Sequence, residues 1–282
     1  MGIYMKYSIF LILIFCLQVS SMEVKKDIYS VGYELFTVQG YLYERKLNLV
    51  FDSGTNYTIL NKGLIDEVKS SNKKIKKRFS KFLDQDILYA NKVDFYLDKN
   101  YTHPSRIVFF DGLTNIPFEI DGILGFEYLY NIGFKVNFQD RILTLNPEEI
   151  YGNKIKIKVE DYDPHIEVII NNCKFSMAID TGASNSSLKE DDWNRLMKCG
   201  STELYKEDIY ANNLLQHMHE KTIDKGVFEI KVGNSISNIV LYQSYGPLSN
   251  SNILGNDFLK DYEIIIPKKS KYIYLNKIEK PE

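Results

Sequence analysis

The sequence predicts a mainly β protein with two homologous, barrel-like lobes and short helices. The 282 residues include 21 Tyr and 16 Phe beside many Ile and Val, and aromatic and β-branched residues favour strands. One set of motifs also occurs twice in the same order, as expected of a duplicated unit. We therefore expect an N-terminal lobe over residues 22–148 and a C-terminal lobe over residues 149–282, preceded by a leader at residues 1–21.

Composition narrows the class of protein. Apolar residues make up 44% and charged residues 26% of the chain, which are values of a folded globular protein. The formal net charge of −2 argues against nucleic acid as a partner. No run of 18 apolar residues occurs, so we expect no stable membrane insertion.

The leader has the order of a secretory signal peptide. Lys6 precedes an apolar stretch at residues 9–19, and two serines follow it. We expect cleavage near residue 21 and export to the periplasm, the cell surface or the medium. Cys16 is not expected to carry a lipid, because Phe15 stands where a lipobox has a small residue.

The repeat is clearest at two aspartates. Residues 49–55 (LVFDSGT) correspond to residues 177–183 (MAIDTGA), and Asp180 follows Asp52 by 128 positions. Residues 122–125 (GILG) correspond to residues 252–255 (NILG), at an offset of 130. The matching order and spacing indicate two related units in one chain.

Each unit shows the same expected elements. Residues 40–51 and 166–179 alternate apolar and polar side chains around a polar turn, which predicts two β-hairpins. Helices are expected at residues 61–82 and 188–198, the second with Ser186 or Ser187 as its cap. We interpret the basic residues between positions 69 and 81 as a solvated face of the first helix.

The cysteines and histidines give no sign of a metal site. Cys173 and Cys199 remain after removal of the leader; in an oxidising compartment they can pair or stay as two thiols, and the sequence leaves both open. The four histidines are scattered, without the spacing of metal ligands. We expect no metal and no organic cofactor.

Two aspartates at equivalent strand ends suggest acid–base chemistry. If the two units pack about an approximate twofold axis, Asp52 and Asp180 meet at one site. Two adjacent carboxylates cannot both ionise easily, so the pair holds one shared proton. The ionised group can take a proton from water while the protonated group donates to a substrate carbonyl.

These motifs resemble those of the aspartic proteases, and each half resembles a retropepsin-like unit. The resemblance covers most of residues 33–146 and 163–276. It implies the acid-protease fold: two lobes related by a pseudo-twofold axis, with the cleft between them. The implied activity is a pepsin-type, single-chain aspartic endopeptidase acting on peptides or proteins. The residues that the resemblance implicates are the catalytic Asp52 and Asp180, the supporting Ser53, Gly54, Thr55, Thr181, Gly182 and Ala183, and the loop glycines Gly125 and Gly255.

Two segments are candidates for the flap that covers the cleft in this family. The candidate segments, residues 86–91 and 208–212, resemble each other but contain no glycine. Tyr89 and Tyr210 are the candidate flap residues, with ordinary strand tyrosines as the alternative.

Two other functional interpretations stay open. The chain can be a peptide-binding protein that has the fold without turnover. Alternatively, each half can pair with the same half of a second chain. The short seam between the halves favours pairing within one chain, so we expect a monomer.

Overall fold

The computed structural model shows a mainly β protein. It describes residues 24–31, 35–80, 85–111, 119–200, 202–213, 216–244 and 251–279. The expected signal peptide and Cys16 lie outside the described residues. No helix in the described part of the chain is long and apolar enough to cross a membrane.

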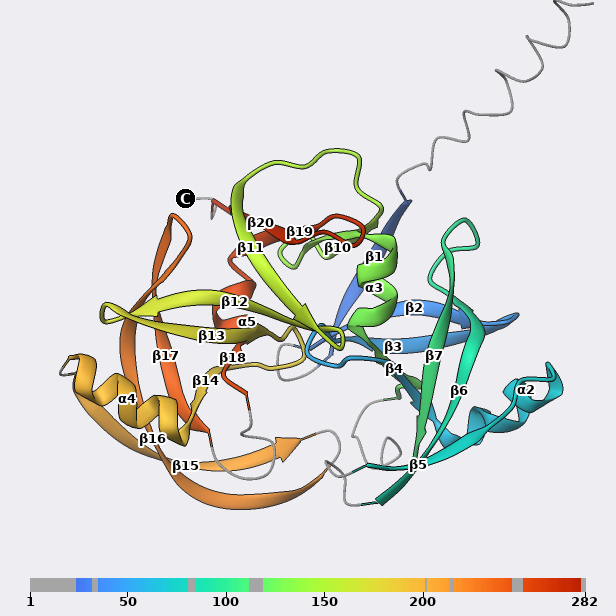
Figure 1. Cartoon of the computed structure of the whole chain (residues 1–282), viewed down its shortest axis with the longest axis horizontal. Helices are drawn as coiled ribbons and strands as arrows, with labels where there is room; N and C mark the ends of the chain where they lie inside the picture. Colours follow the sequence, from blue (N-terminus) through green and yellow to red (C-terminus); the bar gives the residue numbers. More distant parts are fainter. Residues whose placement is uncertain are drawn as a thin grey trace, which may run out of the picture.

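A closed six-stranded barrel lies in the first half of the chain (Figure 1). Pairing runs from β2 through β3, β8, β4, β7 and β6 and back to β2. A further strand, β5, pairs with residues 85–89 of β6. The bounds are β2 Leu35–Leu42, β3 Arg45–Phe51, β4 Thr58–Asn61, β5 Lys76–Ser80, β6 Gln85–Tyr96, β7 Thr102–Phe110 and β8 Gly122–Leu124.

The second half repeats these pairings strand for strand. The order β12, β13, β18, β14, β17 and β16 returns to β12, and β15 pairs with β16 as β5 pairs with β6. The repeat seen in the sequence is therefore a repeat of topology. The bounds are β12 Asp163–Ile170, β13 Cys173–Ile179, β14 Ser186–Lys189, β15 Leu204–Asn213, β16 Gln216–Val232, β17 Ser235–Ser244 and β18 Ile253–Leu254.

A six-stranded antiparallel sheet joins the two sets. Its order is β1–β10–β9–β19–β20–β11, and the central pair β9–β19 places Phe134 opposite Ile266. Figure 1 shows β10, β11, β19 and β20 above the first barrel on the right and the second set on the left. The bounds are β1 Val24–Val31, β9 Phe134–Asn137, β10 Ile142–Leu145, β11 Asn153–Glu160, β19 Tyr262–Ile266 and β20 Tyr272–Lys277.

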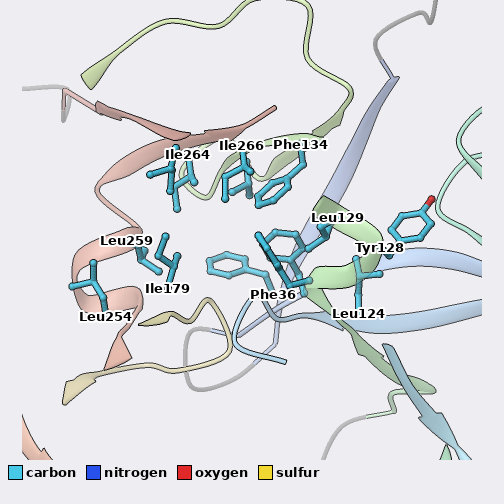
Figure 2. Close-up of a cluster of buried hydrophobic side chains, with 14 of the residues drawn as sticks. Phe36, Leu124, Tyr128, Leu129, Phe134, Ile179, Leu254, Leu259, Ile264 and Ile266 are labelled. Atoms are coloured by element: carbon cyan, nitrogen blue, oxygen red, sulfur yellow. The ribbon is translucent and has the colours of Figure 1, made fainter. Parts of the chain in front are cut away.

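One hydrophobic core runs through both halves. In Figure 2, Phe134 lies beside Ile264 and Ile266, and Ile179 lies near Leu254 and Leu259. These side chains belong to one cluster of buried residues, so the two halves share a core behind the joining sheet. The helices are short: η1 Lys62–Leu64, α2 Ile65–Ser70, α3 Phe126–Ile132, α4 Glu190–Cys199 and α5 Asn256–Leu259.

Both predicted hairpins are confirmed. β2 and β3 turn at Tyr43 and Glu44, and β12 and β13 turn at Asn171 and Asn172. Both asparagines have the positive φ angle that this residue tolerates in turns. The second strand of each hairpin ends directly before an aspartate, Asp52 in the first half and Asp180 in the second.

The predicted helix at residues 61–82 is wrong. Helical residues are confined to η1 and the six-residue α2, which ends at Ser70, and Asn72 then takes a positive φ angle. Lys76–Ser80 instead forms β5, because it finds a partner strand in residues 85–89. Of its basic residues, Lys69 lies on α2, Lys73 and Lys74 lie in the connection, and Lys76, Lys77 and Arg78 lie exposed on β5, while Lys81 lies outside the described residues.

The second helix begins at Glu190, and the predicted serine cap is wrong. Ser186 and Ser187 belong to β14, and Lys189 precedes the helix without a side-chain cap. Three acidic residues in the first turn complement the helix dipole instead. Cys173 and Cys199 form a disulfide that ties the end of α4 to the start of β13.

Candidate active site

The two aspartates follow equivalent strands and occupy equivalent backbone positions. Asp52 comes after β3, and its N–H donates to the Leu124 carbonyl of β8 at 3.2 Å. Asp180 comes after β13, and its N–H donates to the Leu254 carbonyl of β18 at 3.1 Å. Each aspartate is thus held by the partner strand that carries the second motif of its own unit.

The glycines of that second motif lie directly against the aspartate loops. A Cβ atom on Gly125 would be 2.3 Å from the Tyr57 carbonyl carbon, and one on Gly255 would be 2.7 Å from the Asn185 carbonyl carbon. Because any side chain would push these segments apart, only glycine fits. The residue after each glycine also bonds to the aspartate loop. The Phe126 N–H donates to the Thr55 carbonyl at 2.7 Å, and the Asn256 N–H donates to the Ala183 carbonyl at 2.8 Å.

Reciprocal hydrogen bonds join the two loops. The Ser53 N–H donates to the Thr181 hydroxyl at 2.9 Å, and the Thr181 N–H donates to the Ser53 hydroxyl at 3.1 Å. Each hydroxyl in turn donates a hydrogen bond to the other half, Ser53 to the Ile179 carbonyl and Thr181 to the Phe51 carbonyl. Both side chains are 1% exposed, so four hydrogen bonds fix the loops where water does not compete.

This arrangement brings the two carboxyl groups together. They hydrogen-bond to each other. A Cβ atom on Gly54 would be 2.3 Å from the Asp180 Cγ, and one on Gly182 would be 2.5 Å from the Asp52 Cγ. Each carboxyl group therefore rests on the glycine that follows the other aspartate, and neither position has room for a side chain.

Burial perturbs the pKa of both carboxyl groups, and the charge of Asp52 also perturbs the pKa of Asp180. Asp52 is 8% exposed, and its burial raises its pKa, while hydrogen bonds from Thr55 and Gly54 act in the opposite direction. Burial and the charge of Asp52 raise the pKa of Asp180 well above its ordinary range. Two carboxyl groups in contact with raised pKa values can share one proton, which is the pairing that general acid–base chemistry requires.

The donors to the two carboxyl groups differ in one respect. The N–H groups of Gly54 and Gly182 donate to Asp52 Oδ1 at 2.8 Å and to Asp180 Oδ1 at 2.9 Å. The Thr55 hydroxyl donates to Asp52 Oδ2 at 2.6 Å. Ala183 holds the equivalent position in the second loop and has no hydroxyl.

Sequence reasoning missed a second pair of hydroxyls behind the loops. The Thr58 hydroxyl accepts from the Gly125 N–H at 3.2 Å, and the Ser186 hydroxyl accepts from the Gly255 N–H at 2.9 Å. Ser186 also donates to Asp257 at 2.6 Å. Both hydroxyls stand six positions after an aspartate, so the repeat itself carried the signal that could have revealed them.

The two candidate flap tyrosines lie on corresponding hairpins. Tyr89 is on β6, where it is half-buried and has the Arg106 guanidinium 5.8 Å from its ring centre. Tyr210 is on β15, opposite Glu220 of β16, and its side chain lies outside the described part of the chain. The tyrosines thus belong to the corresponding hairpins β5–β6 and β15–β16, while Asp52 and Asp180 follow β3 and β13.

No model of a known protein family matches the chain, and no curated protein matches it either.

Proposed function

We propose that the protein is an aspartic endopeptidase with the acid-protease fold. The two sets of strands would be its lobes, related by a pseudo-twofold axis, with the substrate cleft between them. The observation that carries the proposal is the contact between Asp52 and Asp180, whose two equivalent loops are joined by reciprocal hydrogen bonds between Ser53 and Thr181. A pair of ordinary polar turns has no need of such a link.

The proposed reaction needs one water molecule and one shared proton. The ionised carboxyl group accepts a proton from water, and the water oxygen bonds to the carbonyl carbon of the scissile peptide. The protonated carboxyl group gives its proton to the carbonyl oxygen. The resulting diol collapses as the C–N bond breaks and a proton passes to the nitrogen. No covalent enzyme intermediate forms.

Two features of the chain support single-chain action. Asp52 and Asp180 meet within one chain, and in the joining sheet three strands of the first half pair, through β9 and β19, with three strands of the second half. We propose that a monomer is active and that an extended peptide binds by main-chain hydrogen bonds, in the manner of an added strand. The hairpins β5–β6 and β15–β16 are the elements we propose as flaps.

The signal peptide expected at residues 1–21 supports export, and the disulfide is compatible with it. Cys173 and Cys199 are paired, and disulfides persist in oxidising compartments. We propose that the protein works in the periplasm, at the cell surface or in the medium.

Cleavage of a peptide library between pH 3 and pH 8 tests the proposal. The wild-type protein should cut best at mildly acidic pH, where the pair holds one proton, and the Asp52→Asn and Asp180→Asn variants should not cut. Full activity in either variant would refute the mechanism. Peptide binding by the wild type without cleavage at any pH would instead indicate a binding protein with this fold.

A further inference from the structure

The environment of the two carboxyl groups is less symmetrical than their backbone. Asp52 accepts hydrogen bonds from two backbone N–H groups and from the Thr55 hydroxyl. Among the described residues, Asp180 accepts from two backbone N–H groups, those of Gly182 and Ala183, and from no hydroxyl, and its side chain also shares a hydrogen bond with Asp52. The Thr55 hydroxyl is thus the donor that distinguishes the two sites.

We propose that Thr55 makes the pair unequal, so that Asp52 holds the negative charge and Asp180 holds the shared proton. A hydroxyl that donates to a carboxylate oxygen stabilises the charged form of that carboxyl group. Ala183 offers Asp180 no such stabilisation. The shared proton therefore stays bonded to Asp180, and the protonated carboxyl group donates a hydrogen bond to Asp52.

The charged groups near the pair bear on whether the Thr55 hydroxyl decides which carboxyl group is ionised. Among the described residues, the ionisable group with the largest effect on either carboxyl group is the other aspartate. Asp257, in α5, accepts hydrogen bonds from the N–H and the hydroxyl of Ser186. No cation is among the main influences on the pair in the described part of the site, so none outweighs one hydroxyl donor.

The unequal pair assigns the two chemical roles, and this assignment rests on the proposed function. Asp52, as the carboxylate, takes the proton from water. Asp180, as the acid, gives its proton to the carbonyl oxygen of the peptide. After the attack, Asp52 is protonated and Asp180 is ionised, so the proton that leaves for the amine nitrogen comes from Asp52. Thr55 acts as a positioning residue for the charge and touches no substrate atom in this scheme.

A titration of the carboxyl carbons tests the inference without any need for activity. The full chain is labelled with ¹³C at aspartate Cγ, and the two signals are identified by their loss in the Asp52→Asn and Asp180→Asn variants. In the wild type, the Asp52 signal should show ionisation at lower pH than the Asp180 signal. Ionisation of Asp180 first, or identical curves for both, would overturn the proposal.

Substitution of Thr55 gives the second readout. Thr55→Val keeps the shape and removes the donor, so the first ionisation of the pair should move upward by about one pH unit, from the typical strength of a hydrogen bond to a charged group. Thr55→Ser keeps the hydroxyl and should titrate as the wild type does. An unchanged first ionisation in Thr55→Val, in a folded protein, would refute the role of the hydroxyl.

The pH profile of cleavage separates this inference from the proposed function. If the protein cleaves peptides, the acidic limb of kcat/KM should move upward in Thr55→Val and not in Thr55→Ser. If the protein cleaves nothing, the proposed function fails, while the ¹³C titration still decides where the charge and the proton lie.

Discussion

Replacing Gly54 with alanine puts a methyl carbon where the Asp180 carboxyl group lies. The new Cβ would be 2.3 Å from Asp180 Cγ and 2.6 Å from both carboxylate oxygens. Ordinary contacts between carbon atoms lie at about 3.5 to 4.0 Å, so the carboxyl group or the loop must move by roughly 1 Å. A displacement of that size at a catalytic group costs about 100-fold in rate. Overpacking costs about 1–3 kcal/mol of stability.

The assay compares kcat/KM for one cleaved peptide with the thermal midpoint of each variant. Gly54→Ala and its counterpart Gly182→Ala, which meets Asp52 Cγ at 2.5 Å, should lose activity while remaining folded at the assay temperature. Gly63→Ala is the matched control, because its Cβ would meet only the Asn61 side chain, at 3.3 Å. Wild-type activity in Gly54→Ala would mean that activity does not depend on the close packing of the Asp180 carboxyl group against Gly54.

Three further predictions concern the rest of the structure. Ser53→Ala removes one donor and one acceptor of the loop link, and should cost about 1–3 kcal/mol in urea unfolding; Thr181→Ser, which keeps its hydroxyl, should cost much less. Cys173→Ser opens a disulfide across 26 residues and should cost about 3–4 kcal/mol, an effect that added reductant reproduces in the wild type and leaves unchanged in the variant. Burial raises the pKa of Asp180 in the folded chain. Above about pH 4 the folded chain therefore binds more protons at Asp180 than the unfolded chain does. The free energy of unfolding should then fall as the pH rises from there. The thermal midpoint should therefore drop less between pH 4.5 and pH 7 in Asp180→Asn than in the wild type, and an equal drop would contradict the raised pKa.

The sequence revealed the hairpins because their information is local. Alternation of apolar residues and the Asn171–Asn172 turn suffice to define β12 and β13, and the repeat located the matching elements of the other half. The segment after residue 70 could not be read in this way. Its lysines are compatible with a helix, and it becomes β5 only because residues 85–89 return beside it.

The same division applies to the site. The repeat marked Asp52, Asp180 and their glycines, since motif and spacing survive in the chain itself. Which donors reach which carboxylate oxygen depends on how two loops 128 residues apart meet. The sequence showed that position 183 is alanine where position 55 is threonine, but only the geometry shows that this threonine donates to Asp52.

A comparison of single and double variants is the most direct test of whether Asp52 and Asp180 act as one catalytic unit. The kcat/KM of the wild type would be measured beside Asp52→Asn, Asp180→Asn and the doubly substituted protein, with one peptide at one pH. Residues that act as a unit are strongly non-additive, so each single variant should lose nearly all activity and the double variant should be no slower than either. Losses that multiply, or a loss in only one of the two single variants, would contradict a shared site.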